Sequence, residues 1–200
     1  MEGLDALYPD AHCELEHRNS FELLIAVTLS AQTTDKRVNS VTPELFSKYP
    51  DAAHLAEADL EDVSSIIRPV GLYQNKARNI IRLSKVLVEE YGGEVPKQRM
   101  ALESLPGVGR KSANVILSNC FDVPAFAVDT HVARVSKRLG IAEEDDDVLK
   151  IEKKLMEEFP EEKWGKLHHQ FIFFGRYTCK ARNPECGGCP FVSFCRDHEL

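Results

Sequence analysis

The sequence has little positive charge and no long hydrophobic run. Across 200 residues, 25 lysines and arginines face 32 aspartates and glutamates, for a formal net charge of −7. Such a balance argues against a phosphate-rich partner, because phosphate binding depends on basic residues. No stretch approaches the roughly 18 apolar residues of a membrane span. The N-terminus is acidic where a signal peptide is basic. We therefore expect a cytoplasmic protein with no membrane partner.

Strand signals are also lacking. No segment alternates apolar and polar residues, and no Asn-Gly pair marks a hairpin. Apolar residues instead recur at helical spacing, which predicts an all-α fold. A chain of this length buries enough surface to fold as one domain or as two small ones. The predicted helices span residues 21–29 (with Asn19 or Ser20 as N-cap), 59–67, 76–91, 100–105, 110–120, 130–139, 148–159 and 164–174.

Four of the six cysteines gather near the C-terminus with the spacing C-x6-C-x2-C-x5-C: Cys179, Cys186, Cys189 and Cys195. Four thiols in so short a window, among turn-forming residues, indicate a metal centre. Zinc accepts four thiolates. Zinc modules, however, usually carry two Cys-x2-Cys pairs, and here only Cys186 and Cys189 form one. The spacing therefore favours an iron–sulfur cluster and leaves zinc open.

A glycine-rich turn joins the predicted helices 100–105 and 110–120. Its sequence is Leu105-Pro106-Gly107-Val108-Gly109, and the next helix begins at Arg110. The glycines allow a sharp turn that leaves backbone N–H groups at the helix start, where a phosphodiester can bind. A plain turn between helices is the alternative. The apolar Leu105 and Val108 favour a helix–hairpin–helix motif that packs its own turn.

Two further residues suggest chemistry. Lys111 lies in the first turn of the helix, where the helix dipole disfavours a cation. Most lysines are solvated, but an amine held there beside Arg110 suits a nucleophile that forms a Schiff base with a carbonyl-like carbon, such as C1′ of a deoxyribose. Asp129 offers a carboxylate for proton transfer. Its position before the helix 130–139 also suits an N-cap, and the two roles are compatible.

Together these motifs resemble the endonuclease III family of DNA base excision glycosylases, within the helix–hairpin–helix superfamily. The resemblance runs from about Phe21 to Cys195. It rests on five motifs in the family's order: residues 29–35 (LSAQTTD), residues 70–73 (VGLY) with Lys76-Ala77, the hairpin with Lys111, residues 128–132 (VDTHV) and the four cysteines. It implies two lobes: a six-helix barrel with the hairpin over residues 18–123, and a helical iron–sulfur cluster lobe from residues 1–17 and 124–200.

The resemblance also implies residue roles. Lys111 falls on the family's Schiff-base nucleophile and Asp129 on its catalytic aspartate, and the four cysteines fall on the ligands of one 4Fe–4S cluster. Gln32 and Leu72 fall where the family fills the gap left by an extruded nucleotide. Without the family, Gln32 is interpreted as a helix-terminal polar residue and Leu72 as a buried loop anchor. Further DNA contacts are expected from Val70, Leu105, Gly107, Val108, Gly109, Arg110 and His131.

The function that follows is a bifunctional DNA N-glycosylase and AP lyase of base excision repair. It would remove oxidised pyrimidines from double-stranded DNA and cleave 3′ to the abasic site by β-elimination. We expect a monomer, associated with the nucleoid in a bacterium. One alternative is a monofunctional mismatch glycosylase, which activates water and needs no lysine at position 111. Another is a non-catalytic module that only grips DNA.

The acidic net charge is unevenly distributed along the chain. Residues 66–140, with the hairpin and Asp129, carry a net charge of +6, and residues 164–200, with the four cysteines, carry +2. Residues 1–65 carry −9 and residues 141–163 carry −6. The net-positive segments are those that the resemblance places against DNA. Net charge therefore does not exclude a DNA partner, although long-range attraction to DNA should be weak and affinity should fall with salt.

Overall fold

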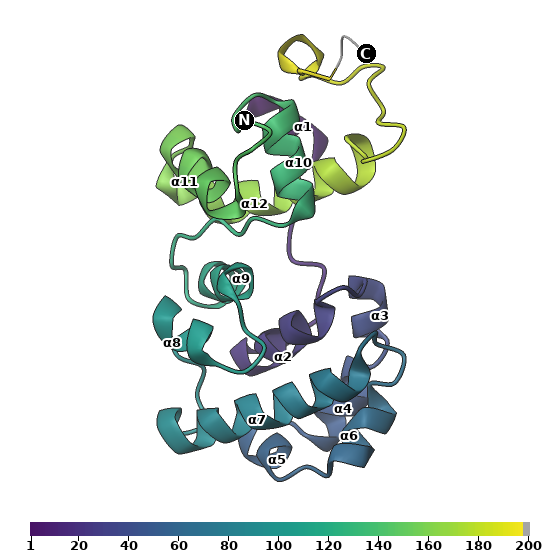
Figure 1. Ribbon diagram of the computed structural model, residues 1–200, viewed down its shortest axis with the longest axis vertical. Helices are drawn as coiled ribbons and strands as arrows, with labels where there is room; N and C mark the ends of the chain where they lie inside the picture. Colours follow the sequence, from purple (N-terminus) through teal and green to yellow (C-terminus); the bar gives the residue numbers. More distant parts are fainter. Residues whose placement is uncertain (198–200) are drawn as a thin grey trace. The chain divides into compact units, whose positions relative to one another are not determined.

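The computed structural model describes residues 1–197, and its chain divides into two compact units. One unit, which we call the hairpin unit, spans Glu14–Asp122. The other, the cluster unit, joins Met1–Cys13 to Val123–Leu200. Every regular element of the described residues is a helix (Figure 1). This confirms the all-α prediction.

The hairpin unit is built around two helices. Residues 21–29 of α2 are all buried, so this helix is covered on every side. It packs against α9 and α7, and the long α7 packs against α5 and α6 (Figure 1). In chain order the helices are α2 (Ser20–Ser30), α3 (Asp35–Asn39), α4 (Thr42–Lys48), α5 (Ala52–Ala56), α6 (Leu60–Ile66), α7 (Tyr73–Tyr91), α8 (Arg99–Ser104) and α9 (Arg110–Cys120).

The cluster unit has its own core, in which Phe126, Phe171 and Phe174 are almost fully buried. Helix α10 packs against α11, α12 and η2, and α1 packs against α12. The elements are α1 (Glu2–Leu7), α10 (Thr130–Arg138), α11 (Val148–Glu158), η1 (Glu161–Lys163), α12 (Trp164–Phe173), the π-helix η2 (Phe174–Thr178) and the 3-10 helix η3 (Val192–Phe194).

Capping residues explain which helix boundaries were predictable. The Asn19 side chain accepts a hydrogen bond from the Glu22 amide and starts α2, as one of its two proposed caps. Gly92, with φ of +62°, ends α7. Helix α7 begins at Tyr73, three residues before the predicted start. Helices α1, α3, α4 and α5, of five to seven residues each, were not predicted, although the equally short α6 and α8 were.

None of the helices in the described part of the chain is long and apolar enough to cross a membrane.

Candidate functional site

The hairpin between α8 and α9 is held by its own apolar side chains. Leu105 and Val108 are 2% and 5% exposed, and the Val108 amide donates to the Leu105 carbonyl over 3.1 Å. Gly107 has φ of +82°, and a Cβ there would lie 3.1 Å from Asn79 and 3.2 Å from Thr28. Only glycine meets both demands. The side chains of Leu105 and Val108 therefore face inward, and what the turn presents outward is backbone.

Helix α9 begins without a side-chain cap. Gly109 is its N-cap residue, and the space around the missing Cβ is open to 4 Å. Arg110 and Lys111 occupy the first turn, and both are half-buried. An uncapped start directs N–H groups and the positive end of the helix dipole outward, which favours an anion. Lys111 is thus placed beside a site suited to a phosphate group.

Helix α10 in the cluster unit, by contrast, begins with a side-chain cap. The Asp129 side chain accepts hydrogen bonds from the amides of His131 and Val132, both over 2.8 Å. This confirms the N-cap role. Both bonds end on Oδ1, so the cap uses one carboxylate oxygen, and Oδ2 takes no part in it. His131 is half-buried, and its Nδ1 lies 3.3 Å from an Arg134 nitrogen.

Gln32 and Leu72 lie on two neighbouring loops and share an unusual backbone. Their φ angles are +55° and +58°, in the left-handed region that non-glycine residues rarely adopt. Gln32 is exposed and Leu72 is 62% exposed, so the interpretation of Leu72 as a buried anchor is wrong. Val70 is 1% exposed. Its side chain supports the loop from beneath and does not lie at the surface for a DNA contact.

The four cysteines line one small cavity in the cluster unit. Phe174, Phe191 and Val192 complete its apolar wall. Burial raises the pKa of the Cys189 thiol, a backbone hydrogen bond from Phe191 opposes the shift, and the other three cysteines raise the pKa further. Thiolates held this close repel one another unless a cation lies between them. A metal centre in the cavity would remove that repulsion, so the donor set fits one.

Two kinds of metal centre take four thiolates. Around a single zinc ion the sulfurs lie about 2.3 Å from the metal and therefore close together. Within residues 1–197, no three His, Cys, Asp or Glu side chains are arranged to hold one metal ion. Four thiols around one cavity are a donor set that zinc and an iron–sulfur cluster both accept.

Two arginines of α10 hold the start of the cysteine loop, a role the sequence did not reveal. Arg138 Nη1 donates to Lys180 O over 2.8 Å and to Cys179 Sγ over 3.4 Å. Arg134 donates to Cys179 O over 3.1 Å and to Gly175 O over 2.6 Å. Their i, i+4 spacing places both on one helix face, which was the only signal available in the sequence.

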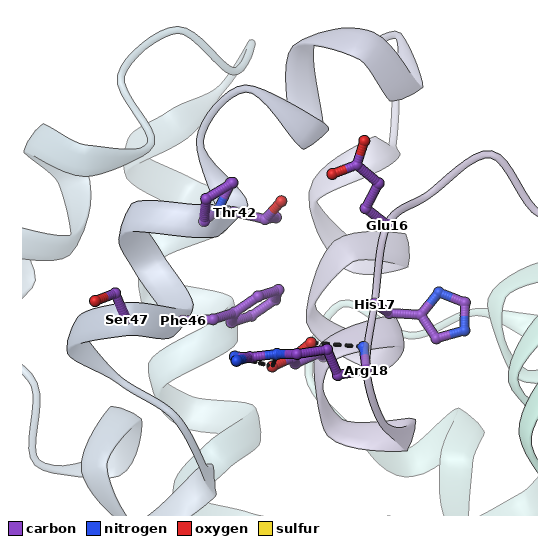
Figure 2. A pocket seen from close by; sticks show the side chains of 8 residues that line it. Glu16, His17, Arg18, Thr42, Phe46 and Ser47 are labelled. Atoms are coloured by element: carbon purple, nitrogen blue, oxygen red, sulfur yellow. Dashed lines mark hydrogen bonds and ion pairs between the residues drawn. The ribbon is translucent and has the colours of Figure 1, made fainter.

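A further cavity of about 430 Å³ lies in the hairpin unit beside the start of α2 (Figure 2). The Arg18 side chain in its wall is paired with the buried Glu22, which also accepts from the Arg18 amide over 2.7 Å. These bonds brace the helix start. The cavity contains none of the predicted site residues.

Comparisons with known proteins agree with this geometry. Residues 25–161 match the family described as HhH-GPD superfamily base excision DNA repair protein, and residues 179–195 match the iron-sulfur binding domain of endonuclease III. Endonuclease III of Bacillus subtilis is 54% identical over 98% of this chain and 90% of its own.

Two solved structures are also similar. A trapped covalent intermediate of endonuclease III with DNA, in an estranged-adenine complex, has a TM-score of 0.96 and 55% identity, over 99% of this chain and 93% of that one. A thermostable thymine-DNA glycosylase has a TM-score of 0.88 and 24% identity, over 99% and 94%. At that identity the second match shows the fold alone.

Proposed function

We propose the function from one premise: the chain belongs to the endonuclease III family of helix–hairpin–helix base excision DNA repair proteins. It is a DNA glycosylase/lyase. We propose oxidised pyrimidines in double-stranded DNA as its substrates, followed by cleavage 3′ to the abasic site. The observation that carries the lyase step is Lys111 in the uncapped first turn of α9, where a phosphate and the sugar attached to it can approach a primary amine.

The proposed reaction begins with attack of the Lys111 amine on C1′. The glycosidic bond breaks and its electron pair leaves with the base, while the amine gives up one proton. The C1′–O4′ bond then opens with its electron pair on O4′, which takes up a proton, and a protonated Schiff base forms between Lys111 and C1′. A proton is then removed from C2′, and the C3′–O bond breaks with its electron pair on the phosphate. Asp129 is the carboxylate proposed to stabilise the cationic intermediate and to move these protons through Oδ2, since Oδ1 is used by the cap.

We propose that backbone amides of the protein contribute more to DNA binding than charged side chains do. The amides of the hairpin at Gly107 and Gly109 are proposed to bind the phosphodiester, assisted by Arg110. C1′ is unreachable inside a stacked duplex, so the damaged nucleotide must be extruded. The exposed Gln32 and Leu72 are proposed to fill the space it leaves, and His131 to contact the backbone. We propose that the protein acts as a monomer, in the cytoplasm where its DNA lies.

The chain carries an iron–sulfur binding domain. We propose that Cys179, Cys186, Cys189 and Cys195 hold one 4Fe–4S cluster. When bound, the cluster supplies metal–thiolate bonds that tie four points of the loop together. Neither base release nor β-elimination transfers an electron to a cofactor, so its proposed role is to position the loop. Metal and sulfide analysis checks this: stoichiometric zinc in place of iron would contradict it.

Borohydride trapping on a duplex with an abasic site tests the lyase step. The wild-type protein should give a covalent adduct, and Lys111→Ala should give none while still binding the duplex. Lys85→Ala is the matched control, because Lys85 is an exposed lysine on α7. Base release without an adduct in the wild type would favour a monofunctional glycosylase. Binding with neither base release nor adduct would favour a non-catalytic module.

Asp129→Asn separates the carboxylate from the cap. Asparagine keeps the Oδ1 acceptor for the two amides but removes the charge. Single-turnover base release should therefore fall by about 100-fold with little change in the melting temperature. Asp129→Ala removes both features and should lower the melting temperature as well. Base release by Asp129→Asn at the wild-type rate would assign Asp129 to the cap alone.

A further inference from the structure

Lys76, in the first turn of α7, is a buried lysine that the proposed chemistry does not use. It is 5% exposed, and burial lowers the pKa of its ammonium. A buried ammonium is costly unless its three N–H groups have partners. The partners of this ammonium lie beside Gln32, one of the residues proposed to enter the DNA duplex.

All three N–H groups of the Lys76 ammonium have acceptors in one short segment. Nζ donates to Leu29 O over 2.9 Å, to Ala31 O over 2.6 Å and to Thr33 Oγ1 over 3.0 Å. The first acceptor belongs to the last turn of α2, where carbonyls lack helical partners and favour a cation. The other two lie on either side of Gln32. The ammonium thus holds in place the residues directly before and after Gln32.

The backbone of the same residue fixes Leu72. The Lys76 amide donates to Leu72 O over 3.1 Å, the first helical bond of α7. The two loops are close: a Cβ added to Gly71 would lie 3.6 Å from Thr33 Oγ1 and 3.8 Å from Gln32 O. Gln32 and Leu72 both have left-handed backbones, which persist only when surrounding contacts enforce them. Lys76 supplies such contacts to both loops.

We propose that Lys76 is a positioning residue that sets the spacing of Gln32 and Leu72, so that the two side chains enter the DNA duplex together. This inference rests on the proposed function, in which those two residues fill the gap left by the extruded nucleotide. Lys76 touches no substrate. It acts through the geometry of the two loops, and the buried charge is retained because no apolar side chain could satisfy three acceptors.

The direct test measures the fluorescence of 2-aminopurine placed opposite a tetrahydrofuran abasic analogue in a duplex. The protein is saturating, so that differences in DNA affinity do not affect the signal. Lys76→Met should reduce the fluorescence change that wild-type protein produces, and single-turnover excision from duplex should fall by about 10- to 100-fold. Thr33→Val, which removes one acceptor at constant shape, should shift both readouts in the same direction by less. Lys85→Met is the matched control and should match the wild type.

A double-mutant cycle separates positioning from general stability. In the Gln32→Ala, Leu72→Ala background, Lys76→Met should cost excision less than twofold, because no side chains remain to be positioned. Loss of the same factor in both backgrounds, or a full 2-aminopurine response from Lys76→Met, would overturn the proposal. If Lys76→Met does not fold, Thr33→Val carries the same cycle. A wild-type protein that neither releases base nor forms an adduct would instead refute the proposed function itself.

Discussion

The hairpin turn (residues 105–109) is proposed to bind DNA and the cysteine loop (residues 179–195) to hold the iron–sulfur cluster, and the two segments are ordered in different ways. The turn buries Leu105 and Val108 and packs Gly107 against α2 and α7 side chains. In the loop, residues 181–188 are all exposed. Protein contacts hold it at its ends, through Arg138 at Cys179 and through the Arg196 amide, which donates to Arg138 O over 2.8 Å. The ring of Phe191, farther along the loop, packs edge-on against Phe174.

This difference separates a site formed by packing from one completed by a cofactor. Apolar burial and a glycine-specific fit give the turn its shape without any ligand. An exposed segment gains little from burial and must offset the loss of chain entropy in another way, for which metal–thiolate bonds are suited. The hairpin is therefore ordered by the protein alone, and the loop by the protein and the cluster together.

The largest expected effect within the turn comes from Gly107→Ala. A residue with φ of +82° and a Cβ 3.1 Å from Asn79 must strain or displace its neighbours, so the free energy of unfolding should fall by about 1–3 kcal/mol. Gly109→Ala is the control: its φ is −102° and its Cβ meets nothing within 4 Å, so the change should stay within about 0.5 kcal/mol. Chemical denaturation measures both. Equal effects would show that the turn is not held by this contact.

Arg138→Met tests the protein's share in ordering the loop. It removes the bonds to Cys179 Sγ and Lys180 O and the ion pair with Asp197, but keeps the apolar stem. The cluster should be lost about 10-fold faster to an iron chelator, as followed by its visible absorbance. Arg182→Met, which removes an exposed arginine within the loop, should leave the rate unchanged. A rate equal to wild type in Arg138→Met would assign the loop's order to the cluster alone.

Features with local signals were predictable from the sequence. The hairpin, the ends of α9 and the Asp129 cap follow from glycine, helical period and capping chemistry. The left-handed backbones of Gln32 and Leu72 could not be predicted, because neither residue type favours that region. The burial of Lys76 could not be predicted, since its acceptors are 43 to 47 positions away in the chain. The short helices α3 to α5 were missed, although α4 and α5 each bury residues spaced i, i+3 and i+4.

The resemblance supplied residue roles that packing does not reveal. Leu72 was interpreted without it as a buried anchor, whereas the structure exposes it. Val70 was expected to contact DNA, and its burial shows how a motif can combine a surface residue with the one that supports it. Sequence patterns identify such motifs as a whole. Which residue of the motif can contact DNA depends on which side chains the fold leaves exposed.

Hydrogen–deuterium exchange, compared between cluster-loaded protein and apoprotein made by removing the iron, tests the central claim most directly. Removal should raise exchange in residues 179–195 and leave the hairpin segment, residues 99–120, unchanged, because the turn is held by burial in its own unit. A loop that exchanges equally slowly with and without the cluster would contradict the account. So would a hairpin that loosens together with the loop.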